Sequence, residues 1–275
     1  MRDFSEDDLS NIRLVVSDMD FTLLKNDKSM PAGIFERIHA LADAGICFAA
    51  ASGRASYTLE KLFGADASAM GLIADNGGVV SHQGKTISVS RIEEGVQREL
   101  VEHSCERDDL LPIVCGITGA RALSSAAPYD DVIHEFYRNL EYVESPDELL
   151  GETAKFTVFV PNGNSREVFE QDFNPRFGDL LSVTCGGDYW IDVMNKGVTK
   201  GTGLKRLAEW LGIDLADVAA FGDTDNDVPL LSCAGHSFLV ENADRRMEKY
   251  ADFSAPSNED EGVLAVIDAI LAAQR

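Results

Sequence analysis

Short apolar segments that end in polar side chains alternate along this sequence with segments of helical periodicity, and this alternation constrains the fold more than any other feature. Residues 13–17 (RLVVS), 46–50 (ICFAA) and 71–74 (GLIA) have the length and composition of buried strands. Apolar residues at helical spacing follow Pro31 and surround Leu59. Strands that alternate with helices form βαβ units around a parallel sheet. The sequence therefore predicts an α/β fold with a doubly wound, mostly parallel, Rossmann-like core.

The alternation stops after about residue 90 and returns near residue 188. Residues 91–187 mix helical segments such as VQRELVEHSCE with alternating strands such as AKFTVFV, without the same order of strand, polar cluster and helix. A chain of 275 residues is long enough for one large domain that carries a second, inserted one. We therefore expect a core formed by residues 1–90 and 188–275, with an inserted α+β domain over residues 91–187.

The charge of the chain limits the partners that it can bind. It has 24 basic and 47 acidic residues, which give a formal net charge of −23. Such a surface repels nucleic acid and anionic membranes, so neither is an expected partner. A bound phosphate group must then be met locally, by a metal ion or by a few placed cations.

Cysteines and apolar segments indicate the compartment. The five cysteines are scattered and form no CxxC pair, so neither a zinc site nor a redox pair is predicted. The N-terminal residues MRDFSEDDLSNIR lack the basic start and apolar run of a secretory signal. No apolar stretch approaches the ~18 residues of a membrane span. These features predict a cytoplasmic protein.

Polar side chains follow four predicted strands, the three given above and residues 217–222 (DVAAFG), at the edge where open parallel sheets bind their ligands. A lysine at the start of a predicted helix joins them, because free backbone N–H groups there favour an anion. The candidate residues are Asp18, Asp20 and Thr22 after the first strand, Ser52, Gly53 and Arg54 after the second, Asn76 with Gly77 after the third, Asp223, Asp225, Asn226 and Asp227 after the fourth, and Lys200.

The chemical demands of phosphoryl transfer account for this selection of residue types. A carboxylate such as Asp18 can attack phosphorus and form an aspartyl phosphate, which divides one difficult hydrolysis into two easier steps. A second acid, Asp20, can protonate the leaving oxygen and later activate water. Crowded carboxylates repel phosphate, so a hard cation is needed, and Mg²⁺ suits Asp18, the backbone carbonyl of Asp20 and Asp223. Ser52 can donate to a phosphoryl oxygen, and Lys200 can neutralise charge in the transition state.

Each of these features also has a structural interpretation. Close aspartates in an acidic chain form solvated turns, and residues 223–227 can cap a helix. Arg54 can pair with a nearby acid, and Asn76 begins an Asn-Gly dipeptide that favours tight turns. Lys196 is an alternative to Lys200. In the insert, four side chains are candidates for a specificity pocket or for ordinary packing: Tyr129, His134, Tyr137 and Arg138.

The strings DMDFTLL, ASGR, KGVTKG and GDTDND, in that order, resemble the four signature motifs of the haloacid dehalogenase (HAD) superfamily of phosphatases. The size and position of the insert, the DNGG turn and the GDxxND pattern resemble the Cof-type subfamily. The resemblance implies a catalytic core and a cap, residues 91–187, that sets substrate specificity. By position it implies the following roles: nucleophile Asp18, acid/base Asp20, phosphate-binding Ser52 and Lys200, magnesium ligand Asp223, support of the metal shell by Asp227, and a phosphate-facing Asn226.

These roles, together with the other polar residues at the strand ends, define two predicted sets. The predicted Mg²⁺ site consists of Asp18, Asp20, Asp223 and Asp227. The predicted phosphate or substrate contacts are Thr22, Ser52, Gly53, Arg54, Asn76, Lys200 and Asn226. The family usually has glycine where Phe21 stands. The catalytic acids are intact, but the resemblance does not fix the detailed shape of the loop, because glycine permits backbone angles that phenylalanine resists.

The sequence therefore predicts a magnesium-dependent phosphatase of small phosphorylated metabolites, with sugar phosphates or similar phosphomonoesters as the expected class. One alternative is a phosphotransferase or phosphomutase, which would pass the same aspartyl phosphate to a sugar hydroxyl. The other alternative is a phospho-acceptor signalling domain without turnover, which needs neither Asp20 nor so large an insert.

Overall fold

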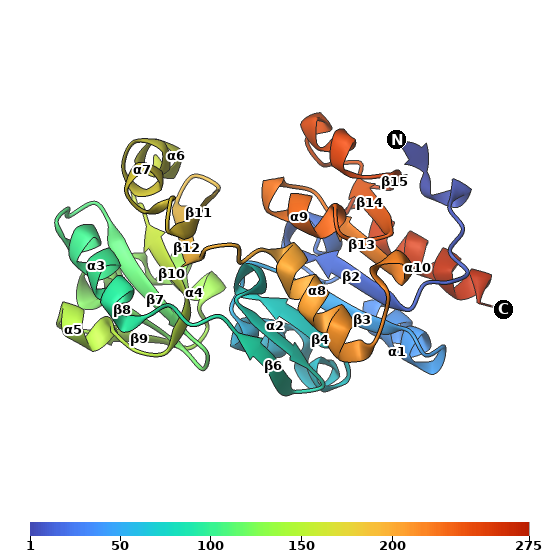
Figure 1. The fold of residues 1–275 in the computed structure, drawn as a ribbon, viewed down its shortest axis with the longest axis horizontal. Coiled ribbons are helices and arrows are strands. Elements are labelled where there is room, and N and C mark those ends of the chain that lie inside the picture. Colours follow the sequence, from blue (N-terminus) through green and yellow to red (C-terminus); the bar gives the residue numbers. More distant parts are fainter. Residues whose placement is uncertain (275) are drawn as a thin grey trace. The chain divides into compact units, whose positions relative to one another are not determined.

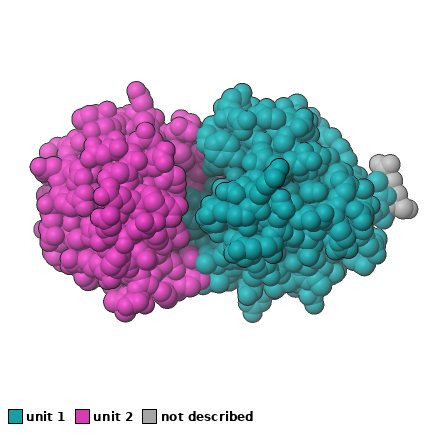
Figure 2. Space-filling view, turned by 90° about the horizontal axis from the view of Figure 1, so that it is seen from above, with its two compact units in different colours: residues 1–53, 63–87, 199–275 teal, residues 54–62, 88–198 magenta. Residues whose placement is uncertain are grey.

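The structure, a computed structural model, describes residues 1–274 and divides into two compact units (Figures 1 and 2). The core unit comprises Met1–Gly53, Phe63–Ile87 and the residues from Thr199 onward. The insert unit comprises Arg54–Leu62 and Ser88–Val198. All of residues 91–187 fall within the insert unit, whose role as a cap stays a prediction.

A nine-stranded sheet forms the centre of the core unit, in the order β1-β15-β14-β13-β2-β3-β4-β5-β6. Neighbours from β15 to β4 in this order are parallel, as are β1 and β15, whereas β4 and β5 are antiparallel. The strands are β1 Arg2–Asp3, β2 Leu14–Asp18, β3 Cys47–Ala51, β4 Gly71–Ala74, β5 Val79–His82, β6 Lys85–Val89, β13 Val218–Gly222, β14 His236–Val240 and β15 Phe253–Ala255.

The strand order reverses beside β2, and this reversal places the site. From β2 the chain adds β3 and β4 on one side, and after the insert it adds β13, β14 and β15 on the other. Open α/β sheets bind ligands at the carboxyl ends of the strands where the order reverses. All five residues of β2 and of β13 are buried, as expected for central strands of a parallel sheet.

Helices cover this sheet (Figure 1). They are α1 Ile34–Asp43, α8 Lys200–Leu211, α9 Val228–Leu231 and α10 Gly262–Ala273, while α2 Ser56–Phe63 lies mostly in the insert unit. The helix expected after Pro31 is α1, which buries Ile34, Ile38 and Leu41 at the predicted spacing. Leu204 and Leu207 of α8 pack against apolar residues of the central strands.

The first turn of α8 fits tightly against its neighbours because it carries two glycines. A Cβ atom on Gly201 would lie 2.2 Å from the carbonyl oxygen of Pro229, and one on Gly203 would lie 2.4 Å from a methyl group of Ile73. Neither position has room for a side chain, so the helix start is held closely against α9 and β4.

The insert unit has a six-stranded sheet in the order β11-β12-β10-β7-β8-β9, antiparallel except for the parallel pair β8 and β9. Its strands are β7 Leu111–Gly116, β8 Ala120–Leu123, β9 Leu140–Val143, β10 Thr153–Phe159, β11 Leu181–Gly186 and β12 Trp190–Asn195. Its other helices are α3 Glu94–Cys105, α4 Asp130–Phe136, α5 Pro146–Leu149, α6 Ser165–Val168 and α7 Asn174–Phe177. The predicted fold class, a doubly wound core with an α+β insert, is confirmed.

Across residues 1–274, every helix is too short or too polar to cross a lipid bilayer.

Candidate active site

The strand β2 brings Asp18 to the carboxyl edge of the core sheet. Asp18 ends the strand and pairs in register with Ala51, the last residue of β3. The hydroxyl of Ser17 donates a 2.7 Å hydrogen bond to the Asp18 carbonyl, and the chain then turns through Met19–Leu23. The Asp18 side chain is buried although it is charged in its ordinary state, so its partners decide its chemistry.

The loop after β13 supplies two further buried carboxylates, Asp223 and Asp227. Asp227 Oδ2 accepts hydrogen bonds from the backbone N–H groups of Asp223 at 3.0 Å and Thr224 at 3.1 Å, which fixes the turn. The hydroxyl of Thr22 donates to Asp223 Oδ1 at 3.1 Å. Thr22 therefore joins the loop after β2 to the loop after β13.

Lys200 is the first residue of α8 and reaches the same place from a third segment. Its ammonium group donates to Asp18 Oδ1 at 2.5 Å and to Asp227 Oδ1 at 2.6 Å. Thr199 caps the helix with its side-chain oxygen, which holds the lysine at the helix start. The side chain is only 1% exposed, so Lys200 meets its carboxylate partners away from bulk water.

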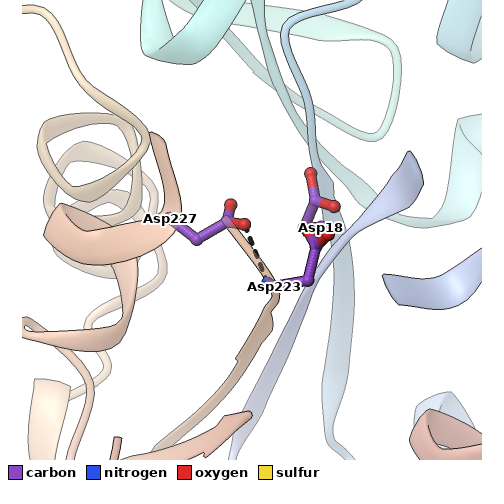
Figure 3. Close-up of side chains that lie close together, drawn as sticks. All are labelled: Asp18, Asp223 and Asp227. Atoms are coloured by element: carbon purple, nitrogen blue, oxygen red, sulfur yellow. Dashed lines mark hydrogen bonds between the residues drawn. The ribbon is translucent and has the colours of Figure 1, made fainter. Parts of the chain in front are cut away.

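Asp18, Asp223 and Asp227 form a cluster that can hold a metal ion (Figure 3). Each offers one carboxylate oxygen, and these oxygens lie within 4.8 Å of one another. Figure 3 shows that the three side chains lie close together, and its dashed line marks the hydrogen bond from the Asp223 backbone to Asp227. The cluster contains three of the four predicted metal ligands; the backbone carbonyl of Asp20 stays a prediction.

Burial and mutual repulsion both disfavour the ionised state of all three carboxylates in this cluster. Burial, and then the charge of Asp227, raises the pKa of Asp18 to about 7, although Lys200 opposes the shift. Burial, and then the charge of Asp18, raises the pKa of Asp223 to about 8. Burial lowers the pKa of Lys200, but Asp18 and Asp227 outweigh it, so the pKa is raised and the amine stays protonated. Hard oxygen donors under such repulsion fit Mg²⁺.

The ends of β3 and β4 contribute a polar row within the core unit. The backbone carbonyl of Ser52 accepts a 2.9 Å hydrogen bond from the N–H of Asn76. A Cβ atom on Gly53 would lie 3.3 Å from the Asn76 amide, so the asparagine side chain lies against this glycine. The Asn226 amide donates to Asn76 Oδ1 at 3.3 Å. Four of the predicted phosphate or substrate contacts are therefore neighbours.

Arg54 and Lys196 lie in the insert unit. The Arg54 guanidinium stacks 5.1 Å from the Phe136 ring and donates to the Glu135 carbonyl at 3.4 Å. Its substrate contact stays a prediction. Lys196 donates to the carbonyl of Gly178, so it is Lys200 that joins the carboxylate cluster.

The candidates in the insert unit differ in their surroundings. The Tyr137 side chain is buried, and its hydroxyl lies 2.9 Å from Thr157 Oγ1. The Tyr129 ring is partly exposed and lies 5.4 Å from the Phe159 ring. His134 lies 3.4 Å from the Asp130 carboxylate on the same helix. Packing accounts for Tyr137, and a pocket role for Tyr129, His134 and Arg138 stays a prediction.

Sequence reasoning missed several residues that shape the loop after Asp18. The carboxylate of Asp20 accepts a 3.0 Å hydrogen bond from the Lys28 ammonium group. The Asn242 amide donates to the Phe21 carbonyl at 2.7 Å, and the Asn258 amide donates to the Leu24 carbonyl at 2.9 Å. Both asparagines stand more than 200 positions along the chain from their partners, so only the fold reveals these contacts.

Comparison with known proteins supplies relatives of nearly full length. A family model described as haloacid dehalogenase-like hydrolase matches residues 15–267. The 5-amino-6-(5-phospho-D-ribitylamino)uracil phosphatase YbjI of Escherichia coli (strain K12) is 34% identical over 266 residues, which cover 95% of this chain and 97% of the relative. The phosphatase YwtE of Bacillus subtilis (strain 168), named for the same substrate, is 25% identical and covers 96% of this chain and 99% of its own.

A solved structure supports the same architecture. SMU.1108c from Streptococcus mutans UA159 aligns with a TM-score of 0.86 at 24% sequence identity, over 95% of this chain and 99% of that one. At this identity the likeness concerns the fold.

Proposed function

We propose that this chain, which belongs to the haloacid dehalogenase-like hydrolases as a phosphatase of the Cof type, releases inorganic phosphate from small phosphorylated metabolites. The proposed intermediate is an aspartyl phosphate that forms on Asp18. The observation that carries the proposal is the buried group in which Lys200 bridges Asp18 and Asp227, with Asp223 beside them. Three carboxylates and an ammonium group from separate segments suit a metal ion and a phosphoryl group together.

In the first step, a carboxylate oxygen of Asp18 attacks phosphorus while the bond from phosphorus to the substrate's ester oxygen breaks. A proton on Asp20 passes to the departing oxygen, which leaves as an alcohol. Ser52 and Asn226 are proposed to hold phosphoryl oxygens, and Lys200 to offset the charge that spreads over them.

In the second step, Asp20 takes a proton from water, and the water oxygen attacks phosphorus. The bond to Asp18 breaks, which restores the carboxylate and frees inorganic phosphate. Asp18, Asp223 and Asp227, with the backbone carbonyl of Asp20, are proposed to hold Mg²⁺. When bound, Mg²⁺ offsets the negative charge of these carboxylates and of the phosphate.

The proposed substrates are phosphomonoesters of sugars, sugar alcohols and similar metabolites. The curated names of two relatives describe a phosphate on a ribityl chain, which is an open-chain sugar alcohol. The net charge of −23 also favours small ligands that are met locally over nucleic acid or an anionic membrane. We further propose a cytoplasmic location, which the five free cysteines support.

A phosphate-release screen of purified protein tests the proposal. We expect Mg²⁺-dependent release from several sugar and sugar-alcohol phosphates, and from 4-nitrophenyl phosphate as a generic aryl ester. Including a sugar hydroxyl acceptor distinguishes hydrolysis from phosphotransfer, because transfer would yield a new phosphate ester instead of inorganic phosphate. A long-lived phosphorylated protein without turnover would instead indicate the signalling alternative.

Removal of divalent ions is expected to lower phosphate release at least about 100-fold, because without the cation the Asp18 nucleophile is partly protonated near pH 7 and the ionised carboxylates of the cluster repel the phosphate dianion. The measurement compares initial rates after treatment with EDTA and after readdition of Mg²⁺. An unfolding curve of the chelated protein controls for loss of structure. Full activity in EDTA would contradict the proposed metal site.

The apparent affinity for Mg²⁺ is expected to rise with pH. In the metal-free protein the pKa of Asp18 is about 7 and that of Asp223 about 8, so at lower pH protons occupy the oxygens that the cation needs. Each displaced proton changes the affinity about tenfold per pH unit. Titration calorimetry should therefore find the dissociation constant at least about tenfold lower at pH 8.5 than at pH 6. An affinity that is constant over this range would contradict the prediction.

The same pKa values set the pH dependence of stability without metal. The ordinary pKa of these carboxyls is 3.8, so between about pH 4 and pH 8 the folded protein binds more protons than the unfolded chain. Stability from this source is therefore lost as the pH rises through that window. Mg²⁺ should raise the unfolding temperature more at pH 8 than at pH 5.

A further inference from the structure

Lys28 and Phe21 form a small assembly beside Asp20, in the loop that follows β2. The Lys28 ammonium group lies 4.7 Å from the centre of the Phe21 ring. The same ammonium group donates to Asp20 Oδ1 at 3.0 Å. One cation therefore contacts an aromatic face and the carboxylate that the proposed function assigns to proton transfer.

Both residues that form this contact have a backbone conformation that side chains resist. Phe21 has φ of 61° and Lys28 has φ of 67°, in the left-handed region that favours glycine. Such conformations persist only where surrounding contacts determine them, and they gather at functional sites. Glycine at either position would lower the backbone strain. The side chains of Phe21 and Lys28 therefore make a contact that glycine could not make.

Hydrogen bonds hold the loop in this shape. The Asn242 amide fixes the Phe21 carbonyl at 2.7 Å. The backbone N–H of Lys28 donates to the Lys25 carbonyl at 2.9 Å, and that of Lys25 donates to the Ser29 carbonyl at 3.0 Å. These bonds close the turn that carries Lys28 and present its side chain to Phe21 and Asp20.

Stability is a weak reason for this arrangement. The side chains of Lys28 and Asp20 are 35% and 27% exposed, and ion pairs in contact with water add little to folding free energy. Orientation is a stronger one. An aspartate in contact with water can occupy several rotamers, whereas a proton donor must lie within hydrogen-bond reach of the departing oxygen.

We propose that Lys28, seated on the Phe21 ring, is a positioning residue that holds the Asp20 carboxyl group in the orientation required for proton transfer to the leaving group. This inference rests on the proposed function, because it assigns a support to the acid of that reaction. The Lys28 ammonium group contacts Asp20 and Phe21, whereas Lys200 is the cation that contacts Asp18 and Asp227. The effect of Lys28 is on the geometry of Asp20.

The dependence of the hydrolysis rate on the leaving group distinguishes a positioning role from a merely structural one. A sugar alcohol phosphate has a poor leaving group that needs a proton as it departs, whereas 4-nitrophenolate departs readily without one. A misplaced Asp20 should therefore slow the first substrate much more than the second. General loss of structure would slow both by similar factors.

The experiment compares kcat/KM for an alkyl phosphate and for 4-nitrophenyl phosphate in four proteins: wild type, Lys28→Met, Lys28→Arg and Lys25→Met. Lys25 is the matched control, because it lies in the same turn but pairs with Glu261 at 3.1 Å. We expect Lys28→Met to lower the alkyl phosphate value about tenfold or more and the aryl value about twofold or less. Lys28→Arg should restore most of the loss, and Lys25→Met should change neither value.

Equal losses for the two substrates, or the same selective loss in Lys25→Met, would overturn the inference. Phe21→Leu provides a second test if Lys28→Met is poorly folded, since it removes the aromatic ring that contacts Lys28 and keeps the ammonium group. It should produce a smaller loss with the same preference for the alkyl phosphate, and equal losses would again overturn the inference. Failure of the wild type to hydrolyse either ester would count against the proposed function instead.

Discussion

Replacing Asp18 by asparagine is expected to lower phosphate release by at least about a thousandfold, because the amide cannot attack phosphorus as a carboxylate does. The change also removes the negative charge from one proposed ligand of Mg²⁺ and from one partner of Lys200. The measurement is kcat/KM for a generic aryl phosphate at saturating Mg²⁺. Phosphorylated protein, trapped and detected by mass spectrometry in the wild type, should be absent from the variant.

The fold of the Asp18→Asn variant should survive. Asparagine is nearly the same size, and it removes the negative charge that, after burial, raises the pKa of Asp223 in the metal-free protein. The matched control is Asp225→Asn, because Asp225 lies in the neighbouring loop but is exposed and paired with Arg246 at 2.8 Å. That control should retain activity. Unchanged turnover in Asp18→Asn would refute the assignment of the nucleophile.

Replacing Gly77 by alanine is expected to destabilise the fold by about 2–5 kcal/mol, from overpacking together with backbone strain. A Cβ atom there would lie 2.2 Å from the carbonyl oxygen of Thr199, and the backbone has φ of 94°. Thr199 caps α8 and precedes Lys200, so the collision also disturbs the lysine that is proposed to bind phosphate. Urea unfolding and kcat/KM should both report the change.

Gly84→Ala is the control that separates strain from collision. Gly84 also has a positive φ, 71°, but a Cβ atom there would meet no atom within 4 Å. This variant should lose only about 1 kcal/mol and keep its activity. Similar losses in the two variants would show that the contact with Thr199 is unimportant and would contradict the prediction for Gly77.

The alternation of strands and helices was sufficient to predict the core. Buried strands such as β2 and β3 are short apolar runs, and their parallel pairing puts their carboxyl ends at one edge whatever lies between them in the sequence. This is why residues as distant as Asp18 and Asp223 could be assigned to one site, and the structure brings them within reach of one metal ion. The roles proposed for them stay predictions until the variants are measured.

Features that depend on backbone detail could not be predicted. The departure from glycine at Phe21 was visible, but the contact with Lys28 requires left-handed backbone at both residues and a turn closed by several hydrogen bonds. Arg54 follows directly on Gly53 in the sequence, yet it belongs to the other compact unit. Short-range patterns do not encode such a change, because the contacts of Arg54 are with Glu135 and Phe136, more than 80 positions along the chain.

The glycines of α8 have a consequence for how this enzyme can acquire new substrates. Gly201 and Gly203 leave no room for a side chain. Ordinary point mutations therefore cannot shift the start of α8, which carries Lys200, without steric conflict. Selection for altered specificity should therefore accumulate substitutions elsewhere, on surfaces that tolerate changes of volume. In a laboratory evolution experiment that selects for hydrolysis of a different phosphate ester, we expect both glycines to be retained.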